Sequence, residues 1–293
     1  MKSAASMLRF ILSMFIFGTI GIFVRYIPLP SSLIALVRAV VGVGFLAFVM
    51  LLKKQKPDKA AIRRNLVLLL VSGAMIGFNW ILLFEAYRYT TVATATLCYY
   101  FAPILVVLFS PFVTGDRLTG KKVFCVFLAL AGMVFISGVI ESGSPRFSEL
   151  LGIGLGLGAA LLYGVIVLMN KKITAIGAYD KTIMQLGSAA IVLLPYCALT
   201  GAFTGITVTA GTAALLCVVG VIHTGLAYFL YFGSMGELPA QSIAVFSYVD
   251  PVVAVLLSAA LLHERMTVFG IIGAFLILGA ALFSELPEKK CKQ

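Results

Sequence analysis

Ten long apolar segments, separated by short clusters of charge, glycine and proline, dominate this chain of 293 residues. A transmembrane helix needs about 20 apolar residues, so each segment is close to the length that crosses a bilayer. The segments lack strand-length alternation, which favours helices over a barrel. We therefore expect an all-α integral membrane protein with ten transmembrane helices. The predicted segments are 8–24, 32–52, 66–86, 92–113, 123–140, 150–170, 181–200, 211–233, 240–262 and 268–284.

The composition excludes a soluble protein. Charged residues make up 11% of the chain and hydrophobic residues 61%, with a mean hydropathy of +1.10, whereas a soluble domain carries about 25% charged residues. The net charge of +11 is spread over short clusters between the apolar segments, which is typical of membrane topology signals rather than of a nucleic-acid-binding face. The five cysteines show no CxxC spacing, so neither a disulfide framework nor a metal site is expected.

Lysine and arginine are distributed unequally between the two sides of the membrane. If the N-terminus is cytoplasmic, the cytoplasmic side holds 17 of them and the outer side holds 4, namely Arg25, Arg88, Arg146 and Arg265. Cytoplasmic loops are enriched in these residues. We therefore expect a multi-pass protein of the plasma membrane (the inner membrane of a bacterium) with both termini in the cytoplasm. The first segment carries no A-x-A-like cleavage site, so it is expected to be helix 1 and not a signal peptide.

The second half of the chain repeats the first. A shift of 148 positions gives 14 identities between residues 77–135 and their partners, including Tyr100/Tyr248 and Pro103/Pro251. Each repeat holds five segments, an odd number, so the second copy should be inverted in the membrane. We expect a first repeat at 1–145 and a second, inverted repeat at 146–293. Inverted repeats are a transporter architecture, although duplication kept only for a symmetric fold is the alternative.

Short motifs in both repeats resemble those of the EamA-type transporters in the drug/metabolite transporter superfamily. The first is Gly115-Asp116-Arg117-Leu118-Thr119, and its second copy is His263-Glu264-Arg265-Met266-Thr267. A third is Ala86-Tyr87-Arg88-Tyr89-Thr90, and an aromatic-glycine pair occurs as Phe17-Gly18 and Tyr163-Gly164. The resemblance covers nearly the whole chain. It implies a carrier of small organic metabolites, often an exporter of amino acids or related compounds.

Asp250 is the strongest candidate for a transport residue, because a carboxylate inside a span is costly. It precedes Pro251, which should free the backbone carbonyl of Ser247. A carboxylate beside an opened carbonyl can bind a cation, an ammonium group or a proton; a hydrogen-bonded structural role is the alternative. The repeat partner is Ala102, so symmetry does not require an acid here.

Two further ionisable residues lie within the segments. His223 could relay protons near neutral pH or simply pack with a hydrogen bond. Arg38 lies roughly 10 Å below the outer end of its helix, where it could hold a substrate carboxylate, pair with Asp250 or extend outward. Glu85 and Arg88, three residues apart, are expected to form a local ion pair.

Aromatic and amide side chains are expected to line a central cavity suited to amphipathic or cationic substrates. The expected substrate-binding residues, with the three ionisable groups included, are Arg38, Asn79, Trp80, Tyr99, Tyr100, Tyr163, His223, Tyr228, Tyr248 and Asp250. Pro103 and Pro251 are predicted hinges or kinks. The small-residue pairs Gly152/Gly156 and Gly154/Gly158 are expected to allow close helix packing.

The predicted function is secondary transport by alternating access, with export as the expected direction. A nucleotide-sugar or other polar-metabolite carrier is the alternative within the superfamily; a channel or an intramembrane enzyme is the alternative outside it. His263-Glu264 begins like a zinc motif, but position 267 is threonine, so no zinc pair forms. We expect no enzyme activity, no cofactor, no metal and no nucleic-acid partner. The expected partners are a small-molecule substrate, membrane lipid and, left open, a coupling proton or ion, with a monomer as the expected state.

Overall fold

The computed structural model describes residues 2–113, 119–136, 146–235, 246–264 and 266–286, with the single residues 140, 238 and 243. Over these residues the chain is helical, with short connections. The helices are α1 (Lys2–Arg25), α2 (Ser31–Leu52), α3 (Lys59–Arg64), α4 (Leu66–Tyr89), α5 (Val92–Tyr99), α6 (Ala102–Val113), α7 (Gly120–Ile136), α9 (Phe147–Lys172), α10 (Ala178–Leu199), α11 (Ala210–Gly220), η1 (Val221–Leu226), α12 (Ala227–Met235), α14 (Val249–Leu261) and α15 (Val268–Glu285).

Each of the ten predicted segments is helical over most of its described residues, so the all-α fold class is confirmed. Within the described residues, seven stretches are long and apolar enough to cross a membrane by length and composition, and α14 and α15 are shorter apolar helices. Helix α3 was not predicted; it is a short surface helix on the connection between α2 and α4. Its start is capped by Asp58, whose side chain accepts a hydrogen bond from the Ala61 backbone N–H.

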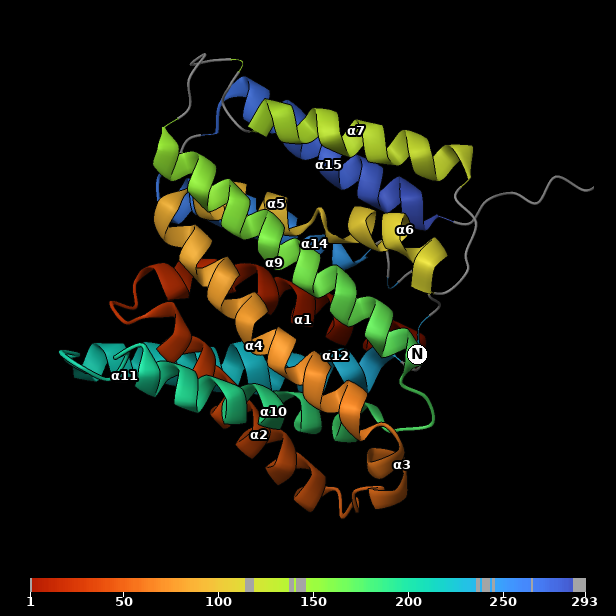
Figure 1. Cartoon of the computed structure of the whole chain (residues 1–293), viewed down its shortest axis with the longest axis vertical. Helices are drawn as coiled ribbons and strands as arrows, with labels where there is room; N and C mark the ends of the chain where they lie inside the picture. The colour runs from red at the N-terminus through yellow and green to blue at the C-terminus, as the bar shows by residue number, and fades with distance from the viewer. Residues whose placement is uncertain are drawn as a thin grey trace, which may run out of the picture.

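The helices pack as two related halves. Helix α9 of the second repeat packs against α4, α5 and α6 of the first, and α1 of the first repeat packs against α12 and α14 of the second. Helices α2 and α10 pair with each other, as do α7 and α15, which lie side by side at one edge of the bundle (Figure 1). In Figure 1, α1 begins near the N label and α9 runs toward it, so these two helices have opposite directions. The opposite directions of α1 and α9 are what two inverted five-helix repeats predict.

The two spans that carry the paired prolines are broken at related positions. Tyr100 and Phe101 separate α5 from α6, and Tyr248 separates the helical residues 246 and 247 from α14. Pro103 and Pro251 fall in the first turn after each break, where a missing backbone N–H is tolerated. The predicted kinks are therefore confirmed as interruptions of the helix, while their role as hinges stays a prediction.

The eighth span contains an interruption that the apolar pattern did not predict. Residues Val221–Leu226 form a π-helix between α11 and α12. His223 Nδ1 lies 3.3 Å from the carbonyl oxygen of Val218, and the Thr224 hydroxyl donates to that of Val219 at 3.1 Å. Both side chains reach back five residues, so they occupy carbonyls within the widened turn. Such π-helical turns are frequent at functional sites.

The glycines of α9 divide into packed and exposed positions. A Cβ atom at Gly152 would lie 2.8 Å from Thr90, and one at Gly156 would lie 2.9 Å from Cys98, which confirms close packing for this pair. A Cβ atom at Gly154 would meet nothing within 4 Å. The predicted packing of the Gly154/Gly158 pair is therefore wrong for Gly154, because this position faces outward.

Candidate functional site

The first helix of each repeat crosses the broken span of the other repeat at a glycine. A Cβ atom at Gly18 in α1 would lie 2.5 Å from the backbone oxygen of Asp250 in α14. At the related crossing, a Cβ atom at Gly164 in α9 would lie 3.6 Å from the backbone oxygen of Ala102 in α6. Asp250 and Ala102 are the residues that the repeat aligns. The two crossings therefore involve related residues, but the one at Gly18 is tighter, and only that one carries a carboxylate.

Asp250 is held by a side chain from the break between α5 and α6. The hydroxyl of Tyr100 donates to Asp250 Oδ2 at 2.8 Å and lies 3.3 Å from the carbonyl oxygen of Ser247. Pro251 lacks the N–H that would bond to this Ser247 oxygen, so the predicted free carbonyl is present and faces Tyr100. The two broken spans thus meet through side chains that the sequence had singled out.

Arg38 is buried in the middle of α2, with 5% of its surface exposed. Its Nε atom donates to the Thr224 hydroxyl in η1 at 2.8 Å. Its guanidinium carbon lies 4.1 Å from the centre of the Trp80 ring and 5.7 Å from that of Phe84, both in α4. This arrangement joins three helices around one positive charge.

His223 is 1% exposed and connects η1 to α1. Its Nε2 atom shares a hydrogen bond of 2.8 Å with the Thr19 hydroxyl, and its ring packs on Phe23 with centroids 4.8 Å apart. Thr19 follows the Phe17-Gly18 pair directly. The hydroxyls of Thr19 and Thr224 are also functional candidates. The charged and aromatic residues of the sequence did not indicate them, and the one sequence signal is their position beside predicted site residues.

The predicted tyrosines gather around these groups. Tyr99 packs on Tyr163 with ring centroids 5.3 Å apart, Tyr100 packs on Tyr248 at 6.1 Å, and Tyr228 packs on Phe17 at 5.4 Å. Tyr99, Tyr228 and Asp250 are each close enough to Arg38 to interact with its charge. The structure therefore brings these predicted residues together in one central cluster, to which Tyr87 and Phe17 are additions.

Asn79 has a different position from that predicted. It is 2% exposed, and its side-chain amide donates to the backbone oxygen of Ala159 at 2.6 Å. The bond fastens α4 to α9, which is a packing role. Trp80, the next residue along α4, lies under Arg38 instead.

Polar contacts fix the helix ends near Glu85 and Glu264. Glu85 and Arg88 form the predicted ion pair at 3.8 Å. Glu264 of the second loop motif accepts a hydrogen bond from the Val92 backbone N–H at 2.9 Å and another from the Ser258 hydroxyl. This loop therefore anchors the start of α5 by accepting hydrogen bonds. The predicted charges Asp116, Arg117 and Arg265 lie outside the described residues.

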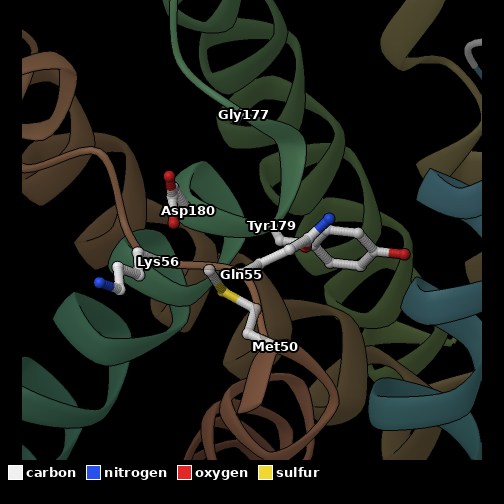
Figure 2. Close-up of a pocket in the computed structure, with 6 residues that line it drawn as sticks. All are labelled: Met50, Gln55, Lys56, Gly177, Tyr179 and Asp180. Atoms are coloured by element: carbon white, nitrogen blue, oxygen red, sulfur yellow. The ribbon is translucent and has the colours of Figure 1, made fainter. Parts of the chain in front are cut away.

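Two surface pockets lie at opposite ends of the bundle, away from the central cluster. One is lined by Met50, Gln55, Lys56, Gly177, Tyr179 and Asp180 (Figure 2). There, Asp180 Oδ2 accepts a hydrogen bond from the Asp58 backbone N–H at 3.1 Å, which ties the α2–α3 connection to α10. The other is lined by Arg25, Arg88, Tyr89, Thr90, Thr91, Glu149 and Glu264. Among the described residues, no group of three His, Cys, Asp or Glu side chains could hold a metal.

The inverted repeats, the broken spans and the buried polar cluster at their crossing define a multi-pass membrane transporter. Comparison with protein families matches residues 4–138 and 150–285 to the EamA-like transporter family. The chain belongs to this family, with one match in each half. The family resemblance of the loop and helix motifs is therefore confirmed, and the protein is a transporter rather than an enzyme.

Individual relatives agree with this assignment. An uncharacterized transporter of Bacillus subtilis, YxxF, is 31% identical over 284 residues, or 96% of this chain and 90% of the relative. A probable amino-acid metabolite efflux pump of Escherichia coli is 27% identical over 59% of this chain and 60% of its own length. A solved crystal structure that is 18% identical matches with a TM-score of 0.64 over 96% of both chains, which supports the fold.

Proposed function

We propose that this transporter exports small organic metabolites, such as amino acids or amphipathic and cationic compounds, by alternating access across the plasma membrane. The observation that carries the proposal is the contact of the two broken spans, where Tyr100 donates to Asp250. In transporters, discontinuous helices at the repeat interface place unpaired backbone groups and side chains at the substrate site. The substrate would bind where these two breaks meet.

The exchange of helices between the repeats supports a rocking motion. Because α1 packs on α14 and α9 packs on α6, each half holds a broken span of the other. The two halves, 1–145 and 146–293, would rock about the crossings at Gly18 and Gly164. The breaks beside Pro103 and Pro251 would let the outer and inner parts of each span move separately.

The chemistry of the cluster supports an organic substrate with a cationic group. Asp250 and the Ser247 carbonyl offer negative charge and an acceptor, and the rings of Tyr99, Tyr163 and Tyr228 offer aromatic faces that attract cations. Tyr99, Tyr100, Tyr228 and Asp250 are only partly buried although they lie within spans, as groups bordering a substrate path would be. The relative from Escherichia coli, named a probable amino-acid metabolite efflux pump, supports the amino-acid class and the outward direction.

The orientation follows from charge. The excess of Lys and Arg on one side supports cytoplasmic termini, and the pocket of Figure 2 would then face the cytoplasm.

Proton coupling would use Asp250, because a carboxylate beside a hydroxyl donor can exchange a proton with substrate binding. We propose a monomer, because the two halves pack against each other within one chain.

Efflux from cells tests the proposal. Cells expressing the protein are loaded with labelled amino acids, peptides or amphipathic amines, and release is followed at several external pH values. We expect saturable release of one compound class, with Asp250→Asn slowing release and flattening its pH dependence. Leu256→Ala, at an exposed position of the same helix, is the matched control. Wild-type release equal to that of cells without the protein, across all classes, would overturn the proposal.

The buried charge of Arg38 favours a second candidate, a carrier of anionic polar metabolites such as nucleotide sugars. Arginine is a good ligand for phosphate. The same assay with vesicles and labelled nucleotide sugars decides between the two. Transport of nucleotide sugars without transport of amino acids would establish this alternative.

A further inference from the structure

Arg38 carries a charge that no ion pair with a described residue neutralises. Within the part of the chain that the structure describes, the one salt bridge joins Glu85 to Arg88. Arg38 donates from Nε to Thr224, and its terminal nitrogens have no hydrogen-bond partner among the described residues. A charge within a membrane span is costly and normally pairs with another group or faces a functional path. The unused donors of Arg38 therefore require an explanation.

Two of the three roles considered for Arg38 disagree with the geometry. An arginine that extends toward the membrane surface would expose its guanidinium, but Arg38 is 5% exposed and lies over the Trp80 ring. An arginine paired with Asp250 would form an ion pair, but these two groups interact only at longer range, and Asp250 is bonded to Tyr100. The remaining role is to bind an anionic group from outside the chain.

We propose that Arg38 is an anion subsite that binds the carboxylate of the transported molecule, so that the site selects zwitterions. This inference rests on the proposed function and assigns opposite ends of the substrate to different repeats. The carboxylate would bind the terminal nitrogens of Arg38 in the first repeat. The ammonium group would bind Asp250 in the second.

The surroundings of Arg38 hold its guanidinium in a fixed plane. Trp80 covers one face at 4.1 Å, and Thr224 engages Nε. The Thr224 hydroxyl is itself directed by its bond to the Val219 carbonyl, which depends on the π-helical turn. A planar guanidinium with two free terminal nitrogens fits the two oxygens of a carboxylate in a bidentate pair. The π-helix thereby contributes to substrate recognition by positioning Thr224.

The balance of charge favours a carboxylate over a phosphate. Arg38 supplies one positive charge, and the Asp250 carboxylate, which acts on Arg38 at longer range, supplies one negative charge. A zwitterion adds one charge of each sign and leaves the site neutral. A phosphate with nearly two negative charges would leave an excess of negative charge in a desolvated site, which is unfavourable.

The position of Trp80 permits a direct binding test, because it is the only tryptophan in the chain. Its fluorescence reports on the guanidinium above it. The full-length protein in detergent is titrated with the non-aromatic amino acids to find the one that changes the emission most. That amino acid is then compared with its decarboxylated amine, its des-amino carboxylic acid and inorganic phosphate. We expect the amino acid to bind more tightly than the other three.

Three variants assign the effect to Arg38. Arg38→Gln should weaken amino-acid binding about 10- to 100-fold, since a hydrogen-bonded ion pair is lost. Arg25→Gln changes an exposed arginine of α1 and should leave binding unchanged. Arg38→Lys keeps the charge without the planar pair of donors, so its affinity should fall between those of the wild type and Arg38→Gln. Arg38→Lys also provides the comparison with the wild type if Arg38→Gln is not monodisperse in size-exclusion chromatography.

Each outcome decides the inference. Equal binding by the wild type and Arg38→Gln, tighter binding of the amine or of phosphate, or no change of Trp80 emission with any amino acid would overturn it. Failure of the proposed function is a separate result. In that case amino acids would change the Trp80 emission in a manner that depends on Arg38, but cells expressing the protein would release no amino acid.

Discussion

The hydroxyl of Tyr100 donates to Asp250 Oδ2 across 2.8 Å, and this bond joins the breaks of two spans that belong to different repeats. The two residues are 150 positions apart in the sequence, yet each lies within a few residues of its own paired proline. The bond is asymmetric, because the repeat partner of Asp250 is Ala102. Only one of the two related positions therefore carries an acidic side chain.

Removing the Tyr100 hydroxyl should impair transport without unfolding the bundle. Tyr100→Phe deletes the donor to Asp250 but keeps the ring that packs on Tyr248. A hydrogen bond to a charged group contributes about 1.5–3 kcal/mol, so we expect transport efficiency to fall by about 10-fold or more. Tyr99→Phe is the control, since Tyr99 packs on Tyr100 and Tyr163 through its ring. Equal losses in both variants would contradict a specific role for the bond.

The two glycine crossings should differ in their tolerance of a methyl group. In Gly18→Ala the new Cβ would lie 2.5 Å from the Asp250 backbone oxygen and 2.8 Å from Val253 Cβ, so α1 and α14 must separate. We expect a loss of about 1–3 kcal/mol in stability and a loss of transport. Gly164→Ala meets only ordinary contacts from 3.5 Å, and Gly154→Ala meets none; both should retain thermal stability and activity. The measurements are thermal unfolding in detergent and efflux. A tolerated Gly18→Ala would contradict the tight crossing.

The spans and their division into two halves could be predicted from the sequence because both depend on patterns that extend over many residues. Apolar length decides which residues enter the bilayer, and the identities at Tyr100/Tyr248 and Pro103/Pro251 mark corresponding places in each half. Asp250 could be identified because charge is so scarce in these segments. Its partner Tyr100 followed from its place before the paired proline.

The π-helix and the roles of Asn79 and Thr224 could not be predicted in this way. A π-helical turn differs from an α-helical turn by one residue, which leaves the apolar pattern of 211–233 unchanged. Whether a buried amide faces a cavity or a neighbouring helix depends on the rotation of its helix, and this rotation is set by packing. Asn79 faces Ala159, whereas Trp80 faces Arg38.

Glu264 should stabilise the contact of its loop with the start of α5 through hydrogen bonds more than through charge. In Glu264→Ala both the Val92 N–H and the Ser258 hydroxyl lose their acceptor, and we expect about 1–2 kcal/mol lower stability, as for the loss of a helix cap. Glu264→Gln keeps one acceptor oxygen, so most of the stability should remain. Glu149→Ala, an exposed acid of the same surface pocket, should have little effect. A glutamine variant as unstable as the alanine variant would indicate that charge dominates.

The proposed orientation can be tested by cysteine labelling. Lys56→Cys and Thr207→Cys each place a thiol on an exposed loop, in a background where Cys217 and Cys291 are changed to serine. A membrane-impermeant maleimide applied to intact cells should label Cys at position 207 but not at position 56. Permeabilised cells should show both. The reverse pattern would place both termini outside and would contradict the inference from the positive charges.

Arg38 and Asn79 should respond to the same replacement in opposite ways. Arg38→Leu removes a buried charge without a paired acid, and the Thr224 hydroxyl retains its bond to Val219. Burying a charge without a paired acid is costly, and leucine avoids that cost, so we expect unchanged or higher thermal stability together with lost transport. Asn79→Leu removes the bond that fastens α4 to α9, and interhelical hydrogen bonds in membranes contribute about 1 kcal/mol. That variant should unfold at a lower temperature and keep its substrate affinity. If Arg38→Leu were the less stable of the two and still transported, Arg38 would be a structural residue and Asn79 the better candidate for the substrate site.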